Sequence, residues 1–204
     1  MEITRIGLFG GTFDPVHNGH ISMIQNAVTE FNLDKIIIIP TGHPYQKERV
    51  GQEITSAEHR INMLRLATEN LSFEVEISAL ETQSTRPSYT VETVDYFKKE
   101  YPNAQLFWIC GSDVLYGIDT WFKFDQLLKN ISLIVITRGR DTIEEVQSRK
   151  AFLEKEYGAS VYITEFHGPD ISSTMIKKNL SVAGEYVAPK VLEYIKNNNL
   201  YELS

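Results

Sequence analysis

The sequence has a single cysteine, Cys110, among its 204 residues. One cysteine excludes an intramolecular disulfide framework, and because it lies in the apolar run LFWIC we expect it to pack in the core. No apolar run reaches the roughly 20 residues that span a bilayer, and the N-terminus lacks the apolar stretch of a signal peptide. These absences predict a cytoplasmic protein with no membrane partner.

Positive charge is also scarce. The chain has 20 basic and 27 acidic residues, a formal net charge of −7. This balance argues against a nucleic-acid partner, which would favour a basic face, but not against a nucleotide held by a local group of backbone N–H groups. The length and the ordinary 42% hydrophobic content predict a single domain over residues 1–204.

Two well-known nucleotide-binding motifs are missing. No G-x-x-x-x-G-K-[ST] occurs, so the chain has no P-loop. Gly7, Gly10 and Gly11 do not fit G-x-G-x-x-G, and the run IIIIP ends at Pro40 without an acidic residue for a ribose. A bound dinucleotide cofactor is therefore not expected.

The most informative segment is residues 6–20, IGLFGGTFDPVHNGH. Its pattern predicts a short strand, a glycine turn and the start of a helix, with Asn18 as the residue that caps the helix. Glycines let the backbone approach a ligand closely, and the first N–H groups of a helix favour negative charge. The segment is suited to binding phosphate.

His17 and His20 stand at the predicted helix start. They could be surface histidines beside a cap, or zinc ligands, and neither is expected in the core. One cysteine and the lack of H-E-x-x-H give zinc little support, and no protein-held metal site is predicted. Beside a phosphate-binding turn, we interpret the two imidazoles as hydrogen-bond donors to phosphate oxygens.

Short apolar segments alternate with helical patterns along the whole chain, which predicts an α/β fold with a doubly wound, mostly parallel sheet. A capping box at residues 55–58 opens one helix. After the first strand, the expected strands are 35–40, 72–77, 105–110, 131–137 and 161–166; the expected later helices are 90–101, 121–129, 142–157, 173–180 and 189–198.

Ligands bind such sheets outside the carboxyl ends of the strands. The segments that follow four predicted strands should therefore converge on one crevice. These segments are 10–20, 41–47, 111–113 and 168–174.

Several motifs occur in one order along essentially the whole chain: GGTFDPVHNGH, PSYTVETV (87–94), GSD (111–113), Trp121-Phe122 and ISSTMIKK (171–178). With them, the chain resembles the nucleotidylyltransferase superfamily, and within it the bacterial nicotinate-nucleotide adenylyltransferases. The resemblance implies a Rossmann-like nucleotidylyltransferase fold. It also implies a reaction between ATP and nicotinate mononucleotide that yields deamido-NAD and pyrophosphate, with Mg²⁺ on the ATP phosphates.

This reaction needs no general base from the protein, because the acceptor phosphate is already an anion near neutral pH. The protein must align two polyanions and neutralise the charge that develops on the α-phosphate and pyrophosphate. The implied catalytic residues are His17, His20 and Lys177. The implied ATP-binding residues are Gly10, Gly11, Thr12, Phe13, His17, His20, Ser172, Ser173, Thr174 and Lys177. The implied acceptor-binding residues are Lys47, Thr90, Gly111, Asp113, Trp121, Phe122 and Arg138.

The chain departs from the family pattern at two positions. Lys177 stands where the family has arginine, so the charge is kept but a bidentate contact is lost. Gln46 replaces a histidine beside Lys47. From the residues alone, Ser172 to Thr174 could simply cap a helix, Lys47 could be a solvated lysine, and Trp121 could be a core residue.

Other functions remain open at this point. The same scaffold could use nicotinamide mononucleotide or phosphopantetheine as acceptor, or could be a non-catalytic nucleotide-binding relative. An aminoacyl-tRNA synthetase would need a tRNA-binding region, for which an acidic chain of 204 residues has no room. The sequence leaves a homo-oligomer open.

Overall fold

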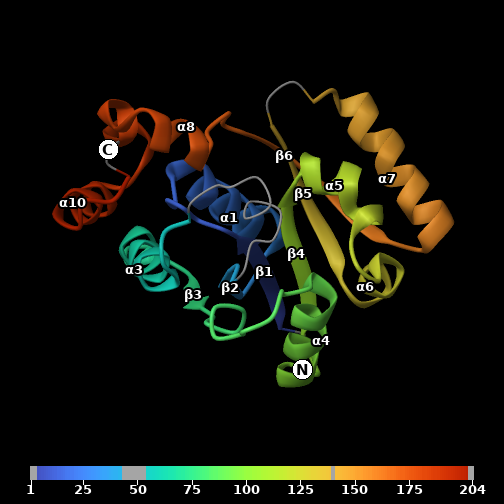
Figure 1. Cartoon of the computed structure of the whole chain (residues 1–204). Helices are drawn as coiled ribbons and strands as arrows, with labels where there is room; N and C mark the ends of the chain where they lie inside the picture. Colours follow the sequence, from blue (N-terminus) through green and yellow to red (C-terminus); the bar gives the residue numbers. More distant parts are fainter. Residues whose placement is uncertain (1–3, 43–53, 139–140, 202–204) are drawn as a thin grey trace.

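The computed structural model describes residues 4–42, 54–138 and 141–201. Within them, six strands form one sheet in the order β3-β2-β1-β4-β5-β6, and every pair is parallel (Figure 1). The doubly wound α/β fold predicted from the sequence is confirmed. The strands are β1 (Arg5–Gly11), β2 (Lys35–Pro40), β3 (Glu74–Ile77), β4 (Gln105–Gly111), β5 (Ser132–Arg138) and β6 (Ser160–Gly168).

The central strands are apolar on both faces, as β2 shows. Ile37 and Ile39 belong to the core cluster on one face of the sheet, whereas Ile36 and Ile38 belong to the cluster on the other. All four side chains are at most 1% exposed. A continuous β-branched run of this kind fits a parallel strand covered on both sides.

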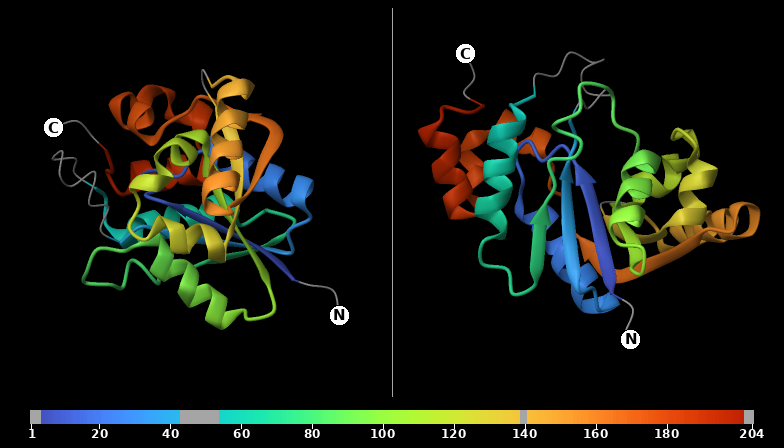
Figure 2. Two further views of the ribbon diagram at one scale, coloured as in Figure 1. Left: turned by 90° about the vertical axis from the view of Figure 1, so that its right-hand side faces the viewer. Right: turned by 90° about the horizontal axis from the view of Figure 1, so that it is seen from below.

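Helices cover both faces of the sheet (Figure 2). One face carries α4 (Thr90–Glu100), α5 (Ser112–Gly117), α6 (Phe124–Asn130) and α7 (Ile143–Tyr157); the other carries α1 (Asn18–Phe31), α3 (Ala57–Thr68), α8 (Ser173–Lys178), α9 (Ala183–Tyr186) and α10 (Pro189–Asn197). The 3₁₀ segments are Ile118–Thr120 and Leu180–Val182. Among the described residues, no helix combines the length and apolar character needed to cross a membrane.

The order of the strands reverses at the centre of the sheet. From β1 the chain moves outward to β2 and β3, then returns to add β4, β5 and β6 on the other side. Connections therefore leave β1 and β4 in opposite directions at their carboxyl ends. In an open α/β sheet this switch point is where a crevice for a ligand forms.

Several predicted helix boundaries are wrong. The residue that caps α1 is His17, not Asn18, and Ser56 caps α3, its hydroxyl accepting a hydrogen bond from the N–H of His59. The helix expected over 121–129 begins only at Phe124, because Trp121 has an extended backbone and Lys123 a positive φ of 51°. The short helix α5 was missed because six residues carry too little of a helical period to detect.

Candidate active site

A cavity of about 1180 Å³ lies at the switch point of the sheet. Its walls come from the carboxyl ends of β1, β2, β4 and β5, from the start of α4 and from the segment before α6. The predicted site residues that line it are Gly10, Gly11, Thr12, His20, Thr90, Gly111, Asp113, Trp121, Phe122 and Arg138. Three of the four segments predicted to converge, 10–20, 41–47 and 111–113, thus contribute to one cavity. The fourth prediction is wrong for the described residues: none of 168–174 lines the cavity, and Arg138 at the end of β5 does so instead.

The two glycines at the end of β1 leave room that other side chains fill. A Cβ on Gly10 would come within 2.7 Å of the Trp108 ring, and one on Gly11 within 2.8 Å of the Phe13 ring. The Phe13 ring therefore supports this turn from inside the core and does not itself line the cavity. Close packing against these two rings therefore requires glycine at both positions, and both glycines line the cavity.

His17 and His20 form a stacked pair at the start of α1. Their ring centroids are 3.6 Å apart, and the backbone N–H of His17 donates to Nδ1 of His20 over 3.2 Å. Since Nδ1 accepts, a neutral His20 ring carries its hydrogen on Nε2. The His20 ring also lines the cavity.

The expectation that neither histidine lies in the core is wrong for His17. Its side chain is only 5% exposed, and its Nδ1 has no hydrogen-bond partner among the described residues. Burial, together with the charge of Arg138, lowers the pKa of His17 from 6.5 to about 4. The ring is therefore neutral at physiological pH.

The buried neutral histidine should make stability depend on pH. Between pH 6.5 and 4, His17 is protonated in the unfolded chain but stays neutral in the folded protein. The contribution of His17 to the free energy of unfolding is therefore complete above pH 6.5 and is lost as the pH falls toward 4. We expect the free energy of unfolding to drop by about 2 kcal/mol from this site between pH 7 and pH 5. Urea unfolding of the wild type and of His17→Gln at both pH values measures it. Equal losses in the two proteins would contradict the prediction.

The motif ISSTMIKK (171–178), called the second signature below, lies against the turn that follows β1. The Ser172 hydroxyl accepts from the N–H of Met175 and so caps α8, and the Ser173 hydroxyl donates to the carbonyl of Pro15 over 2.8 Å. Lys177 pairs with the Asp14 carboxylate over 2.8 Å. Within the described residues, none of Ser172, Ser173, Thr174 and Lys177 lines the cavity. The helix-cap interpretation of Ser172 is confirmed, and the phosphate contacts stay a prediction.

Another part of the cavity wall combines a helix start with aromatic rings. Tyr89 caps α4 without a side-chain hydrogen bond to the helix, and its carbonyl accepts from the N–H of Glu92 over 2.9 Å. The N–H groups of Thr90 and Val91, at the very start of the helix, stay available for other partners. The rings of Tyr89 and Phe122 lie 4.6 Å apart. Asp113 pairs with Arg138 over 3.0 Å across the ends of β4 and β5. Lys47, predicted to bind the acceptor, lies outside the described residues.

The comparison with known proteins decides the family. Residues 8–179 match the model of the cytidylyltransferase-like family. The chain belongs to this family. This cytidylyltransferase-like chain is 36% identical to the probable nicotinate-nucleotide adenylyltransferases of Clostridium botulinum and Neisseria gonorrhoeae. The two alignments extend over 201 and 203 residues, and each covers 97% of this chain and 98% of the relative. The family resemblance seen in the motifs is confirmed.

Solved structures agree on the fold. The cytidylyltransferase-like chain aligns with Plasmodium falciparum nicotinic acid mononucleotide adenylyltransferase complexed with NaAD, with a TM-score of 0.78 over 98% of both chains. Their sequences are 21% identical. At this identity the likeness shows a shared fold.

Sequence reasoning missed a buried polar cluster in this cytidylyltransferase-like fold. Asp14 is 1% exposed and receives hydrogen bonds from Lys177 and from the Tyr201 hydroxyl, at 2.8 and 2.6 Å. Burial alone would raise its pKa, but these bonds outweigh burial and lower it. Arg60, 2% exposed, donates to the carbonyls of Thr55 and Thr12. The partners of Asp14 are 163 and 187 positions away in the sequence, so no local sequence pattern predicts these contacts.

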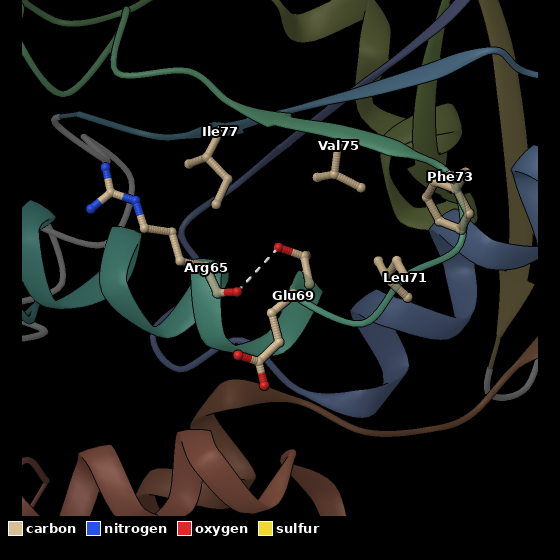
Figure 3. Close-up of a pocket in the computed structure, with 7 residues that line it drawn as sticks. Arg65, Glu69, Leu71, Phe73, Val75 and Ile77 are labelled. Atoms are coloured by element: carbon tan, nitrogen blue, oxygen red, sulfur yellow. Dashed lines mark hydrogen bonds between the residues drawn. The ribbon is translucent and has the colours of Figure 1, made fainter.

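A second, smaller cavity of about 450 Å³ lies between α3 and the edge strand β3 (Figure 3). Apolar side chains line one side of it, Arg65 lies on α3, and Glu69 directly follows that helix. No predicted site residue lines it, and it shares no lining residue with the large cavity. The apolar side chains are Leu71, Phe73, Val75 and Ile77.

Proposed function

We propose that this protein transfers the adenylyl group of ATP to nicotinate mononucleotide, forming deamido-NAD and pyrophosphate in NAD biosynthesis. One observation carries the proposal. A single cavity at the switch point has a glycine turn with His20 at one end and, at the other, the open start of α4 beside Trp121 and Phe122. The names of relatives 36% identical over nearly their whole length support the same reaction.

The reaction joins two anions and needs no base from the protein. An oxygen of the acceptor phosphate attacks the α-phosphorus of ATP; the new P–O bond forms as the bond to the β-phosphate breaks, and pyrophosphate leaves with the electron pair. The backbone N–H groups from Gly10 to Phe13 and the Nε2 donor of His20 would stabilise the charge that develops on these oxygens. Donors already fixed by the fold cost no reorganisation during the step.

His17 has a different part in this arrangement. Its neutral ring stacks on His20, and its backbone N–H fixes the His20 tautomer. His17 would thus act on the phosphates partly through its neighbour. Lys177, which approaches the same turn from α8, would supply the positive charge that the glycine turn lacks.

Magnesium is expected on the ATP phosphates. The carboxylates that line the cavity are already engaged: Asp113 pairs with Arg138, and Glu81, 8% exposed, accepts from Thr93. The described residues contain no group of three His, Cys, Asp or Glu side chains that could hold a metal. These residues fit an ion whose ligands come mostly from phosphate and water, as Mg²⁺ accepts, and when bound it would neutralise phosphate charge.

Recognition of the acceptor should favour the acid over the amide. The open N–H groups at the start of α4 suit a carboxylate, whereas a carboxamide would turn its own NH₂ donors toward them. The rings of Trp121 and Phe122 offer a surface for a pyridinium ring, whose charge adds a cation–π term. A hydrogen bond to a charged group is worth roughly 1.5–3 kcal/mol, which predicts a preference of at least about tenfold.

Pyrophosphate release tests the proposal. Purified protein receives ATP, Mg²⁺ and one of three acceptors: nicotinate mononucleotide, nicotinamide mononucleotide or phosphopantetheine. We expect kcat/KM to be at least about tenfold higher with the nicotinate nucleotide than with the amide. Equal rates with acid and amide would remove the proposed acceptor, a preference for phosphopantetheine would replace it, and no release with any acceptor would favour a non-catalytic nucleotide-binding relative.

A further inference from the structure

Tyr201, close to the C-terminus, reaches back to the turn after β1. Its hydroxyl donates to Oδ1 of Asp14 over 2.6 Å, while Lys177 donates to Oδ2 over 2.8 Å. Each carboxylate oxygen thus has its own donor from a different segment. A carboxylate held at both oxygens cannot rotate, so the position of the Lys177 ammonium is fixed by the same contacts.

Tyr201 also contacts Lys177 more directly. The Lys177 ammonium lies 5.7 Å from the centroid of the Tyr201 ring, within the range of a cation–π contact. Tyr201 itself does not line the large cavity, as far as the described residues go. The route from Tyr201 to Lys177 through Asp14 is the one that these bonds provide.

The stability of the fold alone does not require the cluster of Asp14, Lys177 and Tyr201. Replacing a buried ion pair with well-packed apolar groups is often neutral or even stabilising. Asp14 is 1% exposed, and it directly follows Phe13, the residue whose ring supports the glycine turn. The location of this charge beside the turn points to a function of the cluster in the site.

We propose that Tyr201 is a positioning residue for ATP: through Asp14 it holds Lys177 beside the phosphate-binding turn. This inference rests on the proposed function in one respect, because it requires Lys177 to contact an ATP phosphate. It adds a residue from the far end of the chain that touches neither substrate. ATP binding should therefore depend on a hydroxyl outside the cavity.

Equilibrium titration of ATP by calorimetry tests the inference without any acceptor or turnover. Tyr201→Phe removes only the hydroxyl, and we expect it to raise the Kd for ATP by about three- to tenfold, as coupling within one hydrogen-bond network allows. In a Lys177→Gln background the same change should have no further effect. The matched control is Tyr194→Phe, which removes a half-buried hydroxyl bonded to His59 and Asn62 on α3 and should leave the Kd unchanged.

A second variant keeps the test independent of Tyr201→Phe. Asp14→Asn has nearly the same shape but loses the charge that holds Lys177, so it should also weaken ATP binding. Tighter binding would mean that Asp14 merely competes with phosphate for Lys177 and would overturn the inference. An unchanged Kd in Tyr201→Phe, or an equal rise with and without Lys177, would overturn it as well. Failure of the proposed function would show instead in the acceptor assay, where pyrophosphate release needs the second substrate.

Discussion

His20→Ala should lower kcat by on the order of 10²–10³ while the fold stays intact. The ring lines the cavity, and its Nδ1 accepts from the His17 backbone, so the alanine variant loses a preorganised Nε2 donor. Such a donor acts where charge develops in the transition state, and its loss should therefore affect kcat more than the binding of ATP. Steady-state kinetics with saturating acceptor measure both parameters.

A matched histidine variant controls for this experiment. His59 lies on α3, where its Nδ1 is bonded to the Tyr194 hydroxyl, and it does not line the cavity formed by the described residues. His59→Ala should leave kcat near the wild-type value. A His20→Ala enzyme with normal kcat and only a raised KM for ATP would show that His20 binds the ground state and has no special role in the transition state.

Lys177→Gln should have two effects, one on ATP and one on stability. Losing a charge-assisted phosphate contact should lower kcat/KM for ATP by roughly tenfold or more. The variant also leaves Asp14, 1% exposed, without its cation, so the free energy of unfolding should fall by about 3 kcal/mol. Two hydrogen-bond donors, Tyr201 and the N–H of Thr55, remain on Asp14. The variant should therefore still fold.

The neighbouring lysine and a conservative change separate these effects. Lys178 is exposed, and Lys178→Gln should change neither kcat/KM nor the free energy of unfolding by more than a small amount. Lys177→Arg keeps the charge and should be tolerated in both measurements. If Lys177→Gln and Lys178→Gln both had only small effects, Lys177 would have no function in ATP binding.

The sheet could be predicted from the sequence because each central strand carries its own signal. The run KIIIIP forms β2 over the predicted residues 35–40, since four consecutive isoleucines suit only a strand buried on both faces. The convergence of the strand ends after β1, β2 and β4 was predictable as well, because the carboxyl ends of parallel strands lie at one edge of the sheet. The place of the β5 end in the cavity, in place of residues 168–174, was not.

What could not be predicted depends on contacts between distant segments or on short elements. His17 is buried by packing at the start of α1, and the hydrophobic periodicity of the sequence does not predict this burial. Trp121 was expected at a helix start, but its extended backbone places it before one. The pairing of Asp14 with Lys177 and Tyr201 joins residues brought together only by the complete fold.

The burial of Cys110 has a practical consequence for experiments in solution. Its thiol is 4% exposed and burial raises its pKa, so little of it is the reactive thiolate at neutral pH. It is also the chain's only cysteine. A cysteine introduced at an exposed position, such as Lys178→Cys, should therefore be the one site that a maleimide dye labels. Fluorescence or distance measurements on this protein need no prior removal of native thiols.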